Sequence, residues 1–340
     1  MRRAIAAFLV WAVSMALVVV LFTAVAAAYR YWQMPLAEEA TTVQVEPGQS
    51  MRTVAASLHE LRPAIPARII YWTARFRGQA RQIQAGEYEI RVGERLPALL
   101  DRMVAGDVIE YRLTIPEGVT AAAFLAQLAD APRIRHTLDP LTPEVVTEAL
   151  DLPVESLEGW LFPTTYHYPA GTTDLALLQR AVQLMRAELE AAWAERADDL
   201  PIETAYEALI LASLIERETA VAAERGQIAG VFVNRLKRGM RLQTDPTVIY
   251  GMGDDYQGRL FTKHLRQDTP YNTYTRDGLP PTPIALPSVA SLRAATRPEE
   301  TDALYFVADG SGGHAFSRTL EEHNRAVARW RAHQREAEAN

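Results

Sequence analysis

The sequence predicts an α+β protein with a transmembrane helix at its N-terminus, a small module after it, and a larger α+β domain in the second half. Three observations support this fold class: an apolar run at the N-terminus, short alternating strand patterns beside glycine turns, and long apolar-periodic helices further along the chain. About 300 of the 340 residues follow the first helix. A chain of that length can form more than one hydrophobic core.

The apolar run predicts a membrane anchor with a short cytoplasmic tip over residues 1–32. Between Ala4 and Tyr29 the chain carries no charged residue, and a helix that spans a bilayer needs about 20 apolar residues. Arg2 and Arg3 precede the run without an acidic neighbour. The positive-inside rule therefore places the N-terminus in the cytoplasm and the rest of the chain on the other side of the membrane.

A cleaved signal peptide is the alternative interpretation of the same run. The alanines at 26–28 are small residues of the kind that precede a cleavage site. The run is nevertheless longer than the roughly 7 to 15 apolar residues of a signal peptide. Tyr29, Tyr31 and Trp32 are typical of the aromatic belt at a membrane interface, so retention as an anchor is favoured.

The composition excludes several classes of function. The chain contains no cysteine, which excludes disulfides and thiolate metal sites. Its formal net charge is −7, and the part beyond the anchor is more negative still because the anchor is flanked by arginines. Nucleic-acid binding requires clustered positive charge, so no nucleic acid is expected as a partner. An uncharged or weakly charged substrate fits better.

Residues 40–125 are predicted to form one or more small α+β modules. Strand patterns that lead into a glycine turn begin near Val43, Tyr88 and Arg112, and Ser50 and Thr120 can cap the helices after the first and third. The first copy resembles the LysM glycan-binding module. Residues 126–156 are predicted to be connecting helices.

The second half is dominated by helical patterns over residues 174–196 and 206–219, with a continuation to 239. A strand is predicted at 303–308, followed by a helix that a capping box of Thr319 and Glu322 opens. The helix at 206–219 is apolar on all sides. In a soluble domain such a helix is buried.

This buried helix ends in two glutamates. Glu216 and Glu218 are two residues apart, so they point about 200° away from one another and cannot act on one bond. Glu218 has the more apolar underside, formed by Leu211, Leu214 and Ile215. Desolvation raises the pKa of a carboxyl group and keeps it protonated, as a general acid requires. An ordinary helix-end glutamate paired with a nearby arginine is the alternative.

Five blocks of the sequence form a distinctive signature. They are Leu157-Glu-Gly-Trp-Leu-Phe-Pro163, Glu216-Arg-Glu-Thr219, the run from Val231 to Gly251, Tyr271-Asn-Thr-Tyr274, and Tyr305-Phe-Val-Ala-Asp-Gly310. In this order they closely resemble the MltG (YceG-like) endolytic murein transglycosylases. The resemblance covers nearly the whole chain and implies that residues 157–340 are a YceG-like catalytic domain.

The resemblance implies a lytic transglycosylase of the cell inner membrane, with a single-pass anchor and a periplasmic catalytic domain. Such an enzyme cleaves between N-acetylmuramic acid and N-acetylglucosamine in nascent peptidoglycan strands, leaves a 1,6-anhydro end, and can terminate strand elongation. Glu218 matches the family's catalytic glutamate. One carboxyl group suffices because the sugar's own 6-hydroxyl attacks. Penicillin-binding proteins are implied as partners, and no cofactor is expected.

Seven further side chains are candidates for substrate binding, because they can hydrogen-bond to a sugar or stack on its ring: Glu158, Trp160, Gln243, Asp245, Tyr271, Asn272 and Tyr274. Packing or a local structural role is the alternative for each. Asp245 precedes Pro246 and can be a helix N-cap. His314 has no ligand at metal-binding spacing, so no metal site is expected and a hydrogen bond within its loop is favoured.

Two other functions stay open at this point. A lysozyme-like hydrolase would use two carboxylates, Glu218 together with Glu158 or Asp245. A non-catalytic scaffold would bind glycan through residues 40–120.

Overall fold

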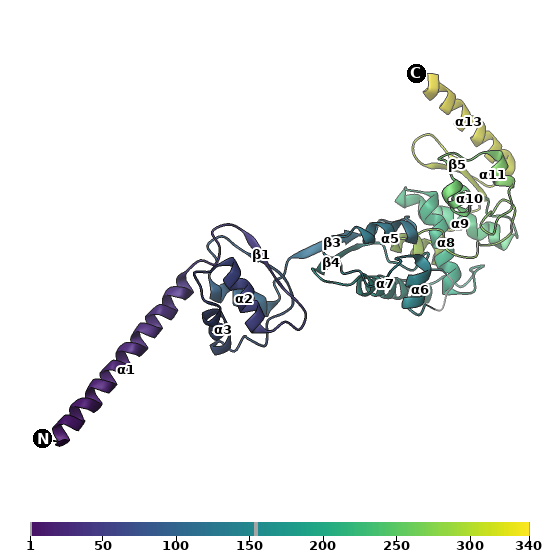
Figure 1. The fold of residues 1–340 in the computed structure, drawn as a ribbon. Coiled ribbons are helices and arrows are strands. Elements are labelled where there is room, and N and C mark those ends of the chain that lie inside the picture. Colours follow the sequence, from purple (N-terminus) through teal and green to yellow (C-terminus); the bar gives the residue numbers. More distant parts are fainter. Residues whose placement is uncertain (1, 153–155, 340) are drawn as a thin grey trace. The chain divides into compact units, whose positions relative to one another are not determined.

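The computed structural model describes residues 2–152 and 156–339, and its internal contacts divide the chain into two compact units (Figure 1). The first unit is Met1–Tyr111 with His167–Thr172, and the second is Arg112–Tyr166 with Thr173–Asn340. The boundary passes through the paired strands β3 (Glu110–Thr114) and β4 (Thr165–Pro169). The domain limits at 125 and 156 stay predictions, and residues 153–155 lie outside the described part.

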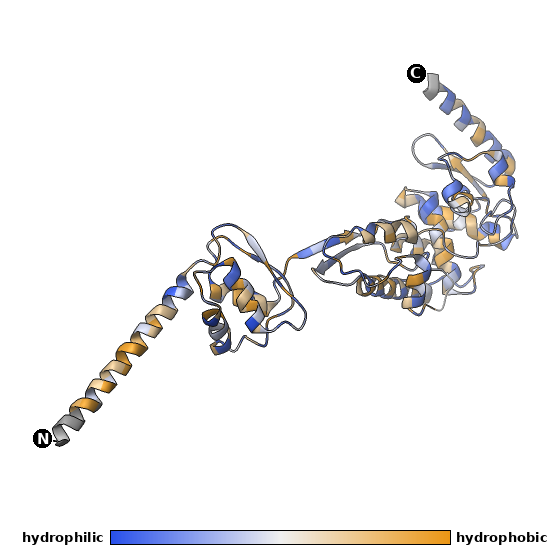
Figure 2. Cartoon of the chain, viewed as in Figure 1, coloured by the Kyte–Doolittle hydropathy of each residue, from blue (hydrophilic) through white to orange (hydrophobic). Residues whose placement is uncertain are grey.

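The N-terminal helix α1 (Arg2–Gln33) is the predicted anchor. Within the described residues one helical stretch, Trp11–Gln33, is long and apolar enough to cross a membrane by length and composition. Its middle is exposed in the structure: Leu21 and Phe22 are 66% and 73% exposed, and Figure 2 shows hydrophobic residues along the helix. The helix is consistent with a single-pass membrane anchor.

The rest of the first unit has the element order β–α–α–β–α. Its elements are β1 (Thr41–Val45), α2 (Met51–Leu61), α3 (Ala67–Phe76), β2 (Gly86–Ile90) and α4 (Leu96–Ala105). Strands β1 and β2 are antiparallel, with Val43 opposite Tyr88. Alternate residues of both strands face a core that α2, α3 and α4 complete with Leu58, Ile70 and Leu99. The likeness of this unit to LysM stays a prediction.

The second unit is mainly helical. Its elements are α5 (Ala121–Ala129), α6 (Pro143–Ala149), α7 (Asp174–Ala194), α8 (Ala205–Glu218), η1 (Ala222–Glu224), α9 (Arg225–Lys237), α10 (Asp245–Met252), η2 (Gly253–Asp255), α11 (Thr262–Arg266), α12 (Val289–Thr296), β5 (Tyr305–Ala308), β6 (His314–Ser317) and α13 (Leu320–Ala339). Helix α8 lies in the core, and every residue from 208 to 215 is buried. Helices α7, α9 and α12 pack around it. The predicted burial of this helix is confirmed.

Local capping signals in the sequence are mostly confirmed. Ser50 and Thr120 cap α2 and α5, and Thr319 forms reciprocal hydrogen bonds with Glu322 at the start of α13. The predicted N-cap role of Asp245 is wrong. Thr244 is the N-cap of α10 and Asp245 is its first helical residue, although the Thr244 side chain donates elsewhere.

The sequence predicted an α+β fold with one apolar helix at the N-terminus, and the structure confirms both features. The strands of the described residues pair in two-stranded sheets, and β5 and β6 form an antiparallel hairpin with Ala308 opposite His314. This hairpin and α13 extend from the end of the helical core where α8 ends (Figure 1).

Candidate active site

A pocket of about 400 Å³ opens in the second unit where α8 ends. It is lined by residues from α8, α9, the segment leading into α10, the 271–276 loop, the β5–β6 hairpin and α13. Four of the predicted site residues line it: Glu218, Gln243, Asp245 and Tyr274. The other four, Glu158, Trp160, Tyr271 and Asn272, do not.

Glu218 is the last residue of α8, and its side chain is partly exposed towards the pocket. Burial raises the pKa of its carboxyl group, and the negative charge of Asp245 acts in the same direction. The hydroxyl of Thr244, which donates to Oε2 at 2.5 Å, opposes this shift. The C-terminal end of a helix also disfavours a negative charge. The net effect keeps the carboxyl group protonated above the normal range of a glutamate, as a general acid requires.

Glu216 faces away from Glu218, as the two-residue spacing predicted. Its carboxylate accepts the backbone N–H of Ser288 at 2.9 Å and the hydroxyl of Ser291 at 2.7 Å, and it pairs with Arg225 at 3.2 Å. Burial acts to raise the pKa of Glu216, but these hydrogen bonds outweigh it and the net shift is downward. Glu216 therefore joins α8 to the start of α12 as a buried ionised group.

Arg235 is a pocket residue that sequence reasoning missed. It is 7% exposed, and its guanidinium donates from Nε to the carbonyl of Leu304 at 2.6 Å. It also donates from Nη1 to the carbonyls of Arg241 and Leu242, at 3.2 and 2.8 Å. A single side chain thus holds together the start of β5 and the loop before α10. These three acceptors are backbone carbonyls, which no side-chain pattern reveals.

The loop before α10 presents Thr244 to Glu218. Gln243 has a left-handed backbone with φ of 50°, which is costly for a residue with a side chain and is retained where its surroundings require it. Its backbone N–H donates to the carbonyl of Thr273 at 3.1 Å, and the N–H of Thr244 donates to the Thr273 hydroxyl at 3.1 Å. The backbone N–H groups of two consecutive residues in this turn therefore both bind Thr273 of the 271–276 loop.

Asp245 and Tyr274 form a pair beside Glu218. The Tyr274 hydroxyl donates to Oδ1 of Asp245 at 2.6 Å. Burial raises the pKa of Tyr274, and the Asp245 carboxylate adds to that shift. Asp245 lies in the first turn of α10. The carboxyl groups of Asp245 and Glu218 thus line one pocket.

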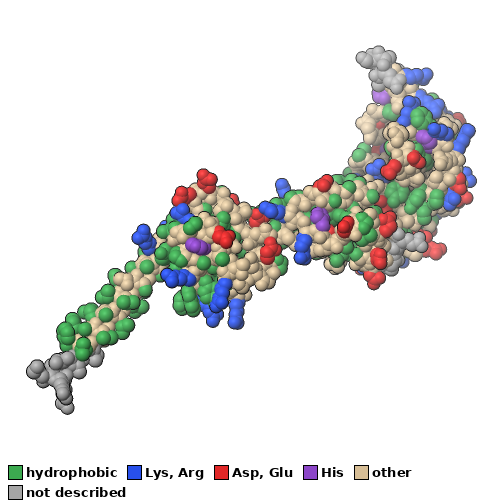
Figure 3. Space-filling model, in the orientation of Figure 1, with side chains coloured by type: hydrophobic (Ala, Val, Ile, Leu, Met, Phe, Trp, Pro, Cys, Tyr) green, Lys and Arg blue, Asp and Glu red, His purple; other side chains and the backbone are tan. Residues whose placement is uncertain are grey.

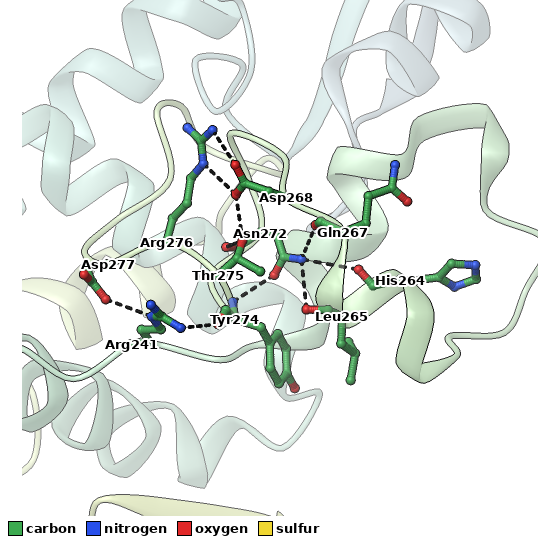
Figure 4. A network of polar contacts seen from close by, with 10 residues as sticks. All are labelled: Arg241, His264, Leu265, Gln267, Asp268, Asn272, Tyr274, Thr275, Arg276 and Asp277. Carbon is green, nitrogen blue, oxygen red and sulfur yellow. Dashed lines mark hydrogen bonds and ion pairs between the residues drawn. The ribbon is translucent and has the colours of Figure 1, made fainter.

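Asn272 organises the loop that carries Tyr274 (Figure 4). Its Oδ1 accepts the backbone N–H of Tyr274 at 2.8 Å. Its amide nitrogen donates to three backbone carbonyls, those of His264, Leu265 and Gln267. The side chain is 1% exposed. These contacts use the hydrogen-bonding capacity of the amide and place it beneath the loop.

His314 and Glu224 form a second pair at the pocket, which sequence reasoning also missed. The carboxylate of Glu224 accepts the His314 backbone N–H at 2.8 Å and lies 2.7 Å from Nδ1 of the ring. A Cβ on Gly313 would lie 2.5 Å from Oε1 of the same carboxylate, so a larger residue there would displace the Glu224 side chain. Partial burial acts to raise the pKa of Glu224, but the hydrogen bonds from His314 lower it overall. The predicted loop contact of His314 is instead a contact with η1, 90 residues away in sequence.

Glu158 lies outside the pocket and is 4% exposed. Its Oε1 accepts the backbone N–H of Ala121 at 2.9 Å, and its Oε2 accepts the hydroxyl of Tyr250 at 3.2 Å. Burial raises its pKa to about 7. This carboxyl group therefore holds the first residue of α5 in place.

Substitution of Glu158 separates this structural role from a catalytic one. We expect Glu158→Ala to lower the free energy of unfolding by about 1–3 kcal/mol, because a buried N–H and a hydroxyl lose their acceptor. Glu158→Gln keeps an acceptor for Ala121 and should retain both stability and the activity of the Glu218 pocket. Urea unfolding and an assay of enzymatic activity measure the two effects. Loss of activity in a stable Glu158→Gln protein would contradict this assignment.

Trp160 and Tyr271 pack at other places in the second unit. Trp160 stacks on Tyr206 with ring centroids 6.0 Å apart and an interplanar angle of 9°, beside a separate hollow of about 560 Å³. The Tyr271 hydroxyl lies 2.9 Å from that of Thr282, and its ring meets Tyr250 edge-on at 4.9 Å. Neither ring reaches the Glu218 pocket.

Comparison with known proteins gives a consistent result. The model of the YceG-like family matches residues 43–329. The endolytic murein transglycosylase of Bacillus subtilis (strain 168) is 31% identical over 309 residues, which cover 85% of this chain and 84% of the relative. That of Streptococcus pneumoniae serotype 2 (strain D39) is 29% identical over 84% of this chain, but only 58% of the relative is covered. A crystal structure of a YceG-like protein from Listeria monocytogenes matches with a TM-score of 0.53 at 29% identity, over 85% of this chain and 99% of that one.

Proposed function

Because this chain belongs to the YceG-like family, we propose that it is an endolytic lytic transglycosylase that cleaves peptidoglycan glycan strands. The observation that carries the proposal is the position of Glu218: its carboxyl group has a raised pKa and lies at the end of a buried helix in a pocket. The names of the similar proteins support the same reaction and substrate.

The reaction that this site supports needs one carboxyl group. Glu218 donates its proton to the glycosidic oxygen between N-acetylmuramic acid and N-acetylglucosamine. The 6-hydroxyl of the muramic acid attacks C1, so the product ends in a 1,6-anhydro ring and no water is consumed. Glu218 then accepts the proton of that hydroxyl. Thr244 holds the carboxyl group in place through its hydrogen bond to Oε2.

The glycan-binding residues are proposed in two groups. Gln243, Asp245 and Tyr274 line the pocket with Glu218 and can bind the sugars next to the cleaved bond. Trp160 and Tyr271 would contact sugars further along the strand. Glu158 and Asn272 act through the backbone that they hold in place.

The membrane placement is also part of the proposal. An apolar α1 that begins with two arginines supports a single-pass anchor in the cell inner membrane, with a cytoplasmic N-terminus and the two units in the periplasm. New glycan strands emerge at this surface, so a tethered enzyme can terminate their elongation. The penicillin-binding proteins that extend the strands are the expected partners, and a LysM-like first unit would bind the same glycan.

A hydrolase is a second candidate, and the shared pocket of Glu218 and Asp245 favours it. Two carboxylates on one bond would allow Asp245 to activate a water. Masses of the products separate the two reactions, because hydrolysis adds one water to each cut and transglycosylation does not.

The test is a digestion of intact sacculi by the purified full-length protein, followed by mass spectrometry. Glycan fragments shorter than the original strands, with 1,6-anhydro ends, would support the endolytic lytic transglycosylase. Reducing ends would overturn it in favour of the hydrolase. Binding to sacculi without any cut would instead indicate a non-catalytic scaffold.

The pH dependence of cleavage should report the pKa of Glu218. A general acid must be protonated, so kcat/KM should fall as pH rises through its raised pKa. Thr244→Val removes a contact that lowers this pKa, and should move the basic limb to higher pH. Asp245→Asn removes a charge that raises it, and should move the limb to lower pH. If kcat/KM falls at the same pH in the wild-type protein and in both variants, a group other than Glu218 controls the pH dependence.

A further inference from the structure

Helix α3 of the first unit carries an unusual exposed face. Arg68, Trp72, Arg75 and Phe76 follow helical spacing along one side of the helix, and all four are exposed. Trp72 is 49% and Phe76 81% exposed, and their rings stack with centroids 5.3 Å apart. Figure 3 shows hydrophobic and Lys/Arg side chains gathered at this side of the unit. We name these four residues the α3 face.

The α3 face lies beside the end of the membrane anchor. Trp32, in the last turn of α1, donates its indole N–H to the hydroxyl of Thr73 at 3.0 Å. Thr73 is buried on the inner side of α3, next in sequence to Trp72. Ala64, in the loop before α3, lines a hollow together with Ala26 and Ala27 of α1. This loop therefore lies alongside the apolar part of α1 rather than beyond its end.

We propose that the α3 face rests on the membrane surface, with Trp72 and Phe76 inserted at the level of the lipid headgroups. Aromatic rings favour this interface, and arginines beside them attract lipid phosphates. The inference rests on the proposed anchor, because α1 must span the bilayer for α3 to reach its surface. A glycan strand could also stack on exposed rings, but the contact of α3 with α1 favours the bilayer.

The consequence is a fixed orientation of the first unit. The Trp32–Thr73 contact holds α1 against the module, but a single transmembrane helix leaves the two together free to rotate and tilt in the bilayer. A second contact at α3 would hold the module against the membrane surface. It would also restrict the direction in which the chain continues from the module into β3.

Single cysteines can test this inference, because the chain has none of its own. The full-length protein carries Phe76→Cys labelled with the fluorophore NBD and is reconstituted in vesicles of phosphatidylethanolamine and phosphatidylglycerol. We expect a blue-shifted emission, quenching by lipids with a spin label near the headgroup, and loss of quenching by aqueous iodide. Leu184→Cys on α7, where the native side chain is 41% exposed, is the matched control and should respond to iodide only.

A third labelled position tests the insertion of α1 separately from the membrane contact of the α3 face. Val18→Cys lies in the middle of α1 and should be quenched by deep spin labels. If position 18 responds to iodide, the anchor itself is wrong. If position 18 is inserted but position 76 stays open to iodide, the α3 face does not touch the bilayer. Protection of position 76 by added glycan strands, without quenching by lipid, would identify glycan as its ligand and overturn the proposal.

A different observation carries a second inference, on the Glu224–His314 pair. The carboxylate of Glu224 occupies Nδ1 of His314, so Nε2 is the ring nitrogen available to a ligand. The ring lines the same pocket as Glu218 and is packed edge-on against Phe306 at 5.4 Å. A histidine whose Nδ1 is held by a carboxylate in this way is arranged to accept a proton at Nε2.

We infer that Nε2 of His314 takes the proton of the attacking 6-hydroxyl in place of the Glu218 carboxylate named in the reaction above, so that Glu218 acts only as the acid. The inference rests on the proposed transglycosylase reaction. The hydroxyl oxygen bonds to C1 while the bond from C1 to the leaving oxygen breaks, and that oxygen takes the proton of Glu218. The imidazolium, paired with Glu224, afterwards returns its proton through water to the Glu218 carboxylate. No proton or electron is gained or lost over the cycle.

The test compares two substitutions of His314. The amide nitrogen of His314→Asn can replace Nδ1 as the donor to Glu224, but nothing replaces Nε2. We expect its kcat to fall about a hundredfold, with KM and Tm unchanged. His314→Ala also loses the contact with Glu224 and should lower Tm as well. Wild-type kcat in the asparagine variant, or a change in KM alone, would overturn the inference, whereas the masses of the wild-type products test the reaction itself.

Discussion

Glu218→Gln should abolish glycan cleavage while the protein stays folded. The glutamine amide cannot donate a proton to the leaving oxygen, and general acid catalysis contributes about 10²–10⁴ in rate. Its carbonyl can still accept the hydrogen bond that Thr244 now donates to Oε2. A neutral side chain also suits a position that already favours the protonated form. The release of anhydro-muropeptides from sacculi measures the effect on kcat.

The control for this substitution is thermal unfolding of the same preparation. We expect the Tm of Glu218→Gln to stay at or slightly above that of the wild-type protein. Release of anhydro-muropeptides at the wild-type rate would show that Glu218 is not the acid. A large drop in Tm would show that the carboxyl group is needed for the fold.

Glu216→Ala, in contrast to Glu218→Gln, should lower the stability of the protein. Its removal leaves the charge of Arg225 without a buried partner and leaves the N–H and hydroxyl of Ser288 and the hydroxyl of Ser291 without an acceptor. Breaking a buried ion pair from one side costs about 3–5 kcal/mol. Urea unfolding of the full-length protein should show this loss in the transition of the second unit.

Two matched variants make the prediction specific. Glu216→Gln keeps an acceptor for Ser288 and Ser291 and should lose less stability than Glu216→Ala. Glu203→Ala removes an exposed glutamate shortly before α8 and should change the free energy of unfolding by no more than about 0.5 kcal/mol. An unfolding midpoint of Glu216→Ala equal to that of Glu203→Ala would contradict the role assigned to the Ser288 contacts.

The pair of glutamates shows how far the sequence could predict the site. The two-residue spacing separated Glu216 from Glu218, and the apolar positions beneath Glu218 predicted its raised pKa, whose direction is confirmed. Family resemblance pointed to the same residue. The groups that control Glu218 were not predicted, because Thr244 lies 26 residues away in sequence and reaches it only through folding of the loop before α10.

The prediction of substrate-binding residues from their chemical type alone was less successful. Glu158 and Asn272 have groups suited to a sugar, yet both are buried and bound to backbone groups. Arg235 and His314 line the pocket, although the sequence reasoning chose neither. A side chain's chemistry says what it can bind, whereas its neighbours in space decide what it does bind.

The sequence by itself determined the features that depend on neighbouring residues: the apolar length of α1, the burial of α8, the caps at Ser50 and Thr120, and the separation of Glu216 from Glu218. Helical period and backbone capping are short-range effects, so a window of a few residues contains them. Only the tertiary structure decided the composition of the pocket. The contacts of Glu218 with Thr244 and of His314 with Glu224 join segments 26 and 90 residues apart, and burial and hydrogen bonding across such distances depend on how the whole unit packs.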